Sequence, residues 1–129
     1  MTASEIYSIY GWYTYANRRE RIPQAGIFQL NDLDGRIEHG FIHDARWGTA
    51  DISEGFLDDR TFDFAKQYGD GSDNVRYEMA PHLGHWRGNW KAEKHIGRAE
   101  LWVARIAIGA KDFSFDKASA DALRPRRMG

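Results

Sequence analysis

Apolar and polar residues alternate along several short stretches of this chain, and turn-forming residues separate those stretches at nearly even spacing. The pattern is clearest over residues 26–68, where it predicts four consecutive strands. Within them, Asp34-Gly35 predicts a two-residue hairpin turn, because a type I′ turn requires positive φ at both central positions. Counting outward from that turn sets Leu30 opposite His39. The face that carries both is mainly apolar, so we expect it to line the interior of the fold.

Two further turns carry this face into the next strands. A four-residue loop over residues 45–48 would set His39 against Glu54 and keep Phe41 inward. A three-residue loop over residues 58–60 would keep the following strand in phase, whereas a two-residue loop would turn its apolar face outward. The expected inward side chains of that strand are Phe62, Phe64, Lys66 and Tyr68, with Lys66 opposite Ile52.

Three polar side chains interrupt this apolar face: His39, Glu54 and Lys66. Directly opposed residues of a sheet lie roughly 5 Å apart and diagonal ones roughly 7 to 8 Å apart, so the three could reach one another. One interpretation is a buried polar network that fixes the strand register, since buried charge is costly unless it is paired. The other is that these groups act on a ligand, with Glu54 orienting His39 as a general base. Lys66 would then stabilise a developing oxyanion or enolate, and Tyr68 would donate a proton.

The second half of the chain continues the alternation. Residues 75–80 predict a strand with Tyr77 on its apolar face, and residues 85–94 predict another with Trp86 and Trp90 inward. Residues 98–107 predict the last long strand, in one of two registers. In the first, a turn at His95-Ile96 buries Leu101 and Val103, and in the second, a turn that includes Gly97 buries Trp102.

Together with a first strand over residues 7–15, this makes about eight antiparallel strands joined mostly by short turns. The pattern is typical of an all-β, up-and-down meander barrel able to hold one small ligand. A chain of 129 residues is long enough for a single domain with one core. We expect the barrel to span about residues 7–107 and a C-terminal extension to occupy residues 108–129.

Several short motifs carry a resemblance to a known group of barrels. They are Gly11-Trp12-Tyr13 in the first predicted strand, Phe64-Ala65-Lys66-Gln67-Tyr68 in the fifth, Trp86-Arg87-Gly88-Asn89-Trp90 in the seventh, and Arg105 in the last. Together they resemble the calycin superfamily, the small meander barrels that include lipocalins, fatty-acid-binding proteins and avidins. The resemblance implies the barrel architecture. It also implies that Trp12 packs near Arg105, a contact that contributes about 0.5 to 2 kcal/mol when a guanidinium stacks on an indole.

Aromatic residues on the inner face of a barrel suit a flat or apolar ligand, because indole and phenol combine a large contact area with one hydrogen-bonding group. The same side chains are also ordinary core residues, and both interpretations stay open. The candidate ligand-binding residues are Phe41, His43, Tyr77, Trp86 and Trp90.

The histidines do not predict a metal site. His39 and His43 would lie roughly 13 Å apart, because they are four residues apart along a strand. His82 and His85 have opposite parity in an extended segment, so they would point to opposite faces. We therefore expect no metal and no cofactor.

Charge and composition narrow the range of partners. A formal net charge of -1 gives no overall field that would attract nucleic acid or an acidic membrane surface. The chain has no cysteine, which excludes disulfides and thiolate metal sites. No segment approaches the length of a membrane span, and the N-terminus lacks a basic region followed by an apolar run. We expect a soluble cytoplasmic protein with no nucleic-acid or membrane partner, and the sequence is compatible with a homodimer.

The sequence supports three hypotheses of different kinds. The first is a barrel that binds a small aromatic or apolar molecule in its interior. The second is a small barrel enzyme, an isomerase, cyclase or lyase, that uses His39, Glu54, Lys66 or Tyr68 for acid-base chemistry. The third is a protein-binding or assembly module whose barrel is filled by its own side chains.

Overall fold

The structure of the protein, a computed structural model, describes residues 4–31, 33–69 and 74–109. Eight β-strands account for most of these residues. The strands are β1 (Ser4–Tyr15), β2 (Ile22–Asn31), β3 (Arg36–Asp44), β4 (Gly48–Leu57), β5 (Phe62–Tyr68), β6 (Val75–His82), β7 (His85–Lys91) and β8 (Ile96–Gly109).

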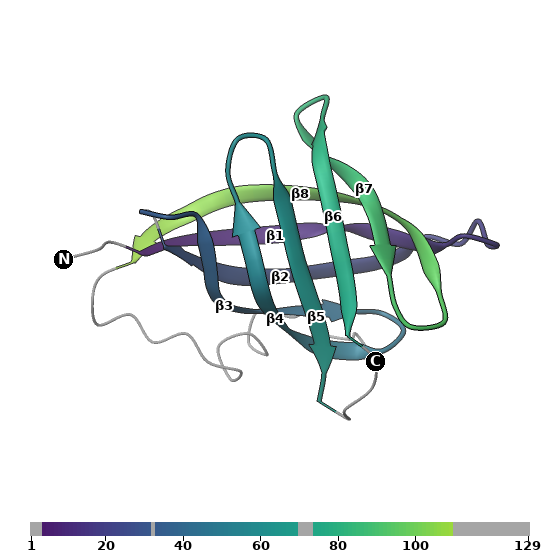
Figure 1. Ribbon diagram of the computed structural model, residues 1–129. Coiled ribbons are helices and arrows are strands. Elements are labelled where there is room, and N and C mark those ends of the chain that lie inside the picture. The colour runs from purple at the N-terminus through teal and green to yellow at the C-terminus, as the bar shows by residue number, and fades with distance from the viewer. Residues whose placement is uncertain (1–3, 32, 70–73, 110–129) are drawn as a thin grey trace, which may run out of the picture.

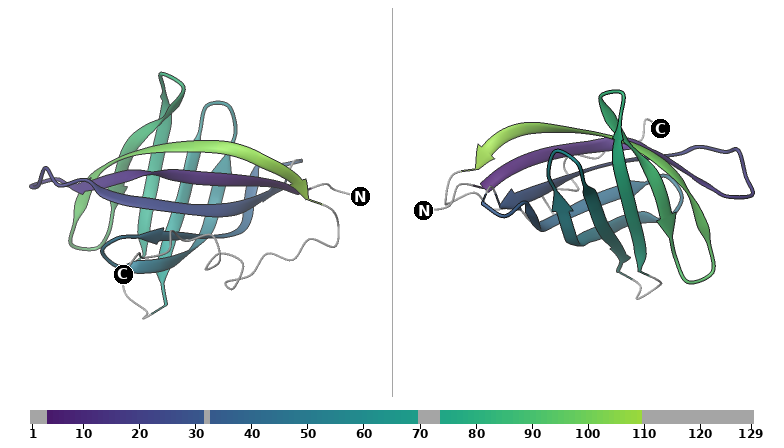
Figure 2. Two further views of the ribbon diagram at one scale, coloured as in Figure 1. Left: turned by 180° about the vertical axis from the view of Figure 1, so that it is seen from behind. Right: turned by 45° about the horizontal axis from the view of Figure 1, so that its top comes forward.

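The eight strands close into a barrel. Each strand pairs antiparallel with the next one in sequence, and β8 pairs with β1. This confirms the predicted all-β, up-and-down meander. Figure 1 shows β1, β2 and β8 crossing behind β5 and β6, and Figure 2 shows the same crossing from the other side, so the interior lies between two crossed layers. Within the part of the chain that the structure describes, no helix has the length and apolar character needed to traverse a bilayer.

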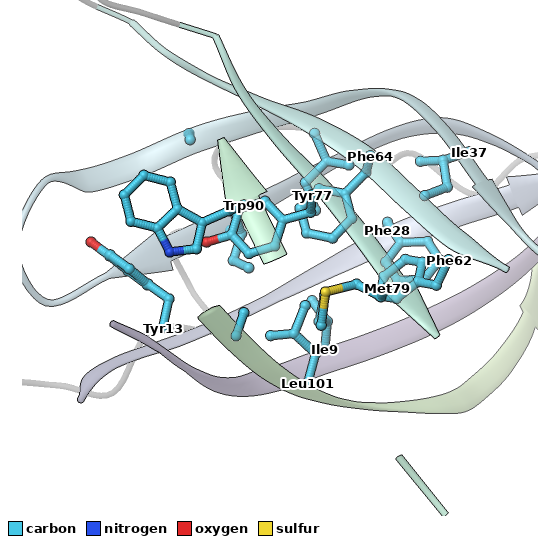
Figure 3. Close-up of a cluster of buried hydrophobic side chains, with 14 of the residues drawn as sticks. Ile9, Tyr13, Phe28, Ile37, Phe62, Phe64, Tyr77, Met79, Trp90 and Leu101 are labelled. Carbon is cyan, nitrogen blue, oxygen red and sulfur yellow. The ribbon is translucent and has the colours of Figure 1, made fainter. Parts of the chain in front are cut away.

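One half of the interior is filled by apolar side chains. Phe28 and Phe62 stack with their ring centroids 5.8 Å apart, and both are fully buried. Figure 3 shows Phe28, Phe62 and Met79 at one end of the buried cluster and Tyr13 and Trp90 at the other. Full burial of one large apolar side chain stabilises a fold by about 1.5 to 3 kcal/mol. We call this packed half of the interior the apolar floor.

The predicted inward faces of β5, β6 and β7 are confirmed. The buried side chains on these faces are Phe62, Phe64, Lys66, Tyr77, Met79 and Trp90, and Ala65 of β5 is buried on the opposite face. On β8, Leu101 is fully buried and Val103 packs against the core. This is the first of the two registers considered, although the turn covers residues 92–95. Trp102 lies on the outer face, where it stacks on Tyr10 with 5.7 Å between ring centroids.

The predicted register between β2 and β3 is wrong. Leu30 pairs with Ile37, and His39 pairs with Gln29, with a bulge between these two pairs. The connection covers residues 32–35 instead of two residues, because β2 ends at Asn31 and β3 begins at Arg36. The two extra residues shift the register by two, which leaves Ile37 inward, and the bulge then shifts the rest of β3 by one residue, which moves its side chains to the opposite face. His39 is consequently exposed on the outer face.

Phe41 also faces outward, contrary to the prediction. It packs against Ile6 and Ile27, which form a small buried cluster separate from the main core. The inward positions of β3 near its end belong instead to Ile42 and Asp44, which are 0% and 1% exposed.

A second bulge changes the end of β4. Glu54 has a positive φ of 50° and lies where the register between β4 and β5 shifts. Its side chain is 71% exposed and pairs with Arg76 on the outside, at 3.5 Å between Oε2 and Nη1. The expected interior contacts of Glu54 with His39 and Lys66 are therefore wrong. The pairing of Ile52 with Lys66, on the near side of this bulge, is confirmed.

Trp12 does not pack on Arg105 as the resemblance implied. The guanidinium of Arg21 lies over the Trp12 ring, 4.3 Å from its centroid. Arg105 instead pairs with Glu5, at 3.0 Å between Nη1 and Oε1. The strands span residues 4–109, slightly more than the expected 7–107, and the rest of the expected C-terminal extension lies outside the described residues.

Candidate functional site

A cavity of about 260 Å³ occupies the half of the barrel that the apolar floor leaves open. It lies at the end where the chain turns from β1 to β2, from β3 to β4 and from β7 to β8, and these three hairpins gather toward the right of Figure 1. We call it the end cavity. Its lining residues are Tyr13, Tyr15, Trp47, Lys66, Tyr68, Val75, Tyr77, Trp90, Ala92 and His95. The walls are thus mainly aromatic, with one amine among them.

That amine belongs to a buried ion pair. Lys66 Nζ lies 3.4 Å from Asp44 Oδ2, and the two side chains are 1% and 0% exposed. Lys66 projects inward from the end of β5 because it shares the parity of Phe62 and Phe64. Asp44 is the last residue of β3, and the three-residue turn that follows brings it to the same depth. Two charges that would each be costly alone are therefore buried together.

Asp44 has its hydrogen-bonding capacity filled. Its Oδ1 accepts the backbone N–H of Arg46 at 2.9 Å and of Trp47 at 2.6 Å, which closes the β3–β4 turn. Its Oδ2 accepts a hydrogen bond from the Tyr68 hydroxyl and one from Lys66. A carboxylate offers about four acceptor sites, and all four have donors here. Asp44 therefore holds the site together and has no acceptor site left for a ligand.

Lys66 is enclosed by polar and aromatic groups. Its Nζ donates to Gln24 Oε1 at 3.1 Å, and the other end of that amide donates to the Tyr77 hydroxyl at 3.3 Å. The ammonium lies 4.9 Å from the ring centroid of Tyr13, 5.3 Å from that of Tyr68 and 5.4 Å from that of Tyr77. Aromatic faces attract a cation, most strongly when it is desolvated. The third N–H of Lys66 therefore faces the rings that line the end cavity.

The Tyr13 hydroxyl is an exception among these polar groups. Tyr13 is 3% exposed, and its hydroxyl has no hydrogen-bond partner among the described residues. An unsatisfied buried polar group costs about 1 to 3 kcal/mol. Tyr13 lines the end cavity, so a ligand oxygen that displaced the atoms covering this hydroxyl would supply the missing acceptor.

The rim of the cavity is built from a second group of aromatic residues. Trp90 donates its indole N–H to Thr14 O at 2.9 Å. This contact depends on Gly97, because a Cβ at that position would lie 2.4 Å from Trp90 Nε1. Tyr15 stacks on His95 with 5.5 Å between ring centroids and accepts the indole N–H of Trp47 at 3.0 Å. Trp47 is 59% exposed, so its indole lies between the cavity and solvent.

The ionisation of the site follows from its burial. Burial lowers the pKa of Lys66 to about 8, and the neighbouring carboxylate opposes this change. Burial alone would raise the pKa of Asp44, but the Lys66 charge, the Tyr68 hydroxyl and the turn N–H groups together hold it below its usual value. Burial, and then the charge of Asp44, raises the pKa of Tyr13. At neutral pH the site therefore contains one cation, one anion and neutral phenols.

The predicted site residues fall into two groups. Lys66, Tyr68, Tyr77 and Trp90 line the end cavity. Trp86 is half-buried and belongs to the apolar floor, where it packs edge-on against Phe62 with 5.6 Å between ring centroids.

The other predicted site residues lie on the outside of the barrel. His39 and Glu54 are exposed there, so neither meets Lys66. Phe41 belongs to the small outer cluster, and the ring of His43 contacts the Thr49 hydroxyl at 3.2 Å. The expected group of His39, Glu54 and Lys66 does not form.

Three central residues were missed: Tyr13, Gln24 and Asp44. Gln24 shares its parity with Phe28 and Leu30, so extending the alternation of β2 backward would have placed it inside. Asp44 would have been found by allowing the β3–β4 turn three residues. Aspartate commonly begins such turns by accepting backbone N–H groups. No sequence signal shows that the Tyr13 hydroxyl lacks a partner.

Chemically, the end cavity offers flat apolar walls, a phenolic hydroxyl that has no partner among the described residues, and an amine whose pKa burial lowers to about 8. Within the described ranges, no three side chains of His, Cys, Asp or Glu gather as a metal ion would need. Comparison with known proteins finds no matching family model, no similar curated protein and no similar solved structure. The function is therefore inferred from the site.

Proposed function

We propose that the protein binds a small, flat aromatic molecule in the end cavity. The observation that carries this proposal is Tyr13, which lines an aromatic cavity of about 260 Å³ and whose buried hydroxyl has no partner among the described residues. An apolar cavity of about 150 Å³ holds benzene. The end cavity thus suits a ligand of about two fused rings. Membership of the calycin superfamily is part of this proposal, and the closed eight-stranded meander supports it.

The hydrogen bonds of the site specify one more feature of the ligand. Asp44 has donors on both oxygens, so a ligand donor would find no acceptor there. Two groups can still donate, the third N–H of Lys66 and the Tyr13 hydroxyl, and the ammonium can only donate. The ligand therefore carries an acceptor such as a carbonyl oxygen beside its rings.

A second candidate is an enzyme that uses the same cavity for acid-base chemistry. It is favoured by Lys66, whose burial lowers its pKa to about 8, because a group that titrates near the working pH transfers protons efficiently. Lys66 and Tyr68 are the remaining candidates for this role, since His39 and Glu54 lie outside the barrel. The assembly-module hypothesis expected a filled interior, and the end cavity favours the binder over it.

Binding is tested with two molecules of similar shape, 2-naphthamide, which has a carbonyl acceptor, and 2-ethylnaphthalene, which has none. Trp47 and Trp90 line the cavity, so a bound ring should quench tryptophan fluorescence. We expect saturable quenching by both, with 2-naphthamide about tenfold tighter because it satisfies the buried hydroxyl.

Matched variants locate the binding site. Ala92→Phe fills part of the cavity and should abolish quenching. Leu33→Phe places the same ring at a position that is 76% exposed in the β2–β3 connection and should leave it unchanged. Quenching that survives Ala92→Phe, or no saturable quenching by either molecule, would contradict the proposal.

A further inference from the structure

Lys66 has the surroundings of a nucleophile as well as those of a structural cation. Its side chain is 1% exposed, yet it lines the end cavity, so a ligand that enters the cavity meets it without bulk water between them. Two of its three N–H groups point to Gln24 and Asp44. The remaining direction faces the rings of Tyr13, Tyr68 and Tyr77. A carbonyl group bound against those rings would lie in front of the amine.

We propose that Lys66 forms an imine with aldehyde ligands in the end cavity, with the Tyr13 hydroxyl hydrogen-bonded to the carbonyl oxygen. This inference rests on the proposed function, since it takes the same ligand class and adds a covalent bond. The cavity supplies the two protein groups that the reaction needs, an amine and a hydrogen-bond donor. Lys66 and Tyr13 both line the cavity, and the buried Tyr13 hydroxyl has no partner among the described residues.

The step balances within the site. The ammonium first gives one proton to Asp44 Oδ2, which lies 3.4 Å away. The neutral amine then attacks the carbonyl carbon, a C–N bond forms, and the attacking nitrogen passes a proton to the oxygen, which becomes the hydroxyl of a carbinolamine. That hydroxyl takes the proton held by Asp44 and leaves as water, and a protonated C=N bond remains. Overall, one ammonium and one aldehyde give one iminium and one water.

Asp44 gives this step a particular advantage. The charge of the nitrogen is +1 before and after the reaction, so the buried carboxylate balances it in both states. An uncompensated buried charge would be costly at either stage. Burial also increases the neutral fraction of the amine. With a pKa of about 8 instead of the ordinary 10.5, that fraction at pH 7 is larger on the order of a hundredfold.

The experiment traps the imine by reduction. One equivalent of 2-naphthaldehyde is incubated with the full chain at pH 7, and cyanoborohydride then reduces the C=N bond to a stable amine. We expect a single adduct whose mass gain equals the aldehyde minus one oxygen atom. Trypsin does not cleave after an alkylated lysine, so the label should appear in an uncut peptide of residues 61–76.

Two variants and one further ligand make the result decisive. Lys66→Arg keeps a cation beside Asp44 but cannot form an imine, so the adduct should fall at least tenfold. Lys91→Arg, at an exposed strand position, should leave it unchanged. 2-Naphthamide binds without forming an imine, and its quenching in Lys66→Arg also reports whether that variant keeps the cavity.

The outcomes separate the two proposals. If 2-naphthamide binds but the label spreads over surface lysines and is equal in wild type and Lys66→Arg, the imine proposal is overturned and the binder stands. If 2-naphthamide does not bind either, both fall. A label confined to Lys66 in the wild-type peptide supports the imine directly.

Discussion

Asp44 and Lys66 form an ion pair that is almost completely removed from solvent, with 3.4 Å between Oδ2 and Nζ. The pair joins the end of β3 to the end of β5, and Gln24 from β2 adds a third strand. It lies next to the cavity and above the apolar floor. The pair therefore contributes to the shape of the barrel as well as to the chemistry of its open end.

The two charges should be strongly coupled in stability. Asp44→Asn and Lys66→Met each leave one buried partner uncompensated, and each should cost about 3 to 5 kcal/mol of unfolding free energy. The double variant should cost clearly less than the sum, because no lone charge remains. Urea unfolding of all four proteins at pH 7 measures the coupling.

The matched control is the exposed pair Glu54–Arg76, where Glu54→Gln and Arg76→Met should couple by about 1 kcal/mol or less. Additive costs at the buried pair would contradict this account.

The depressed pKa of Lys66 predicts how stability depends on alkaline pH. Between about pH 8 and pH 10.5, the unfolded chain holds a proton on this lysine that the folded chain has released. The free energy of unfolding should therefore rise as pH increases through this window. Above pH 10 the effect is opposed, because Tyr13, Tyr68 and Tyr77 have raised pKa values and stay protonated in the folded state only. Unfolding titrations from pH 7 to 10 should show the rise in wild type and lose it in Lys66→Met. If the free energy of unfolding depends on pH in the same way in the two proteins, Lys66 does not cause the rise.

The two tyrosines beside Lys66 should respond differently to loss of the hydroxyl. Tyr13→Phe removes a buried hydroxyl that has no partner, so its unfolding free energy should stay equal to wild type or increase by up to about 1 kcal/mol. Tyr68→Phe removes a hydrogen bond to a buried carboxylate and should cost about 1 to 3 kcal/mol.

Ligand titrations add a second test of the same pair. Tyr13→Phe should weaken 2-naphthamide about tenfold and leave 2-ethylnaphthalene unchanged. If Tyr13→Phe proves as destabilising as Tyr68→Phe, the Tyr13 hydroxyl is already hydrogen-bonded in the free protein. It is then not available to bind a ligand.

The rim of the cavity depends on a glycine. Gly97→Ala would place a Cβ 1.8 Å from Thr14 O and 2.4 Å from Trp90 Nε1, so the indole must move and lose its hydrogen bond. We expect a loss of about 1 to 3 kcal/mol in unfolding free energy and weaker quenching by 2-naphthamide. Gly69→Ala is the control, since nothing lies within 4 Å of a Cβ there, and it should change stability by less than about 0.5 kcal/mol. Equal behaviour of the two variants would show that Trp90 does not need this close approach.

The sequence predicted the barrel correctly because the face that a strand residue occupies follows from its position along the chain. The pairing of β5, β6 and β7 has no bulge, and Lys66, Tyr77 and Trp90 were placed on the inner face by parity alone. The Asp34-Gly35 signal located a turn. The length of the connection was not available from it, because Asn31 and Asp34 side chains accept backbone N–H groups and support a longer loop.

Two bulges explain why the predicted site residues His39 and Glu54 do not meet Lys66. A bulge adds one residue to one strand and reverses the face of everything beyond it, and alternating sequences carry no mark of it. The bulge in the β2–β3 pairing sent His39 and Phe41 outward, and the one at Glu54 sent that carboxylate outward. The true partner of Lys66 is Asp44, which reaches the interior because its turn is one residue shorter than expected.

The most direct test of the central claim is a crystal structure of the protein with 2-naphthamide bound. We expect the rings to lie in the end cavity against Trp90, with the carbonyl oxygen within hydrogen-bond distance of the Tyr13 hydroxyl. A ligand found only on the outer surface of the barrel, or a cavity closed by its own side chains in the presence of saturating ligand, would contradict it.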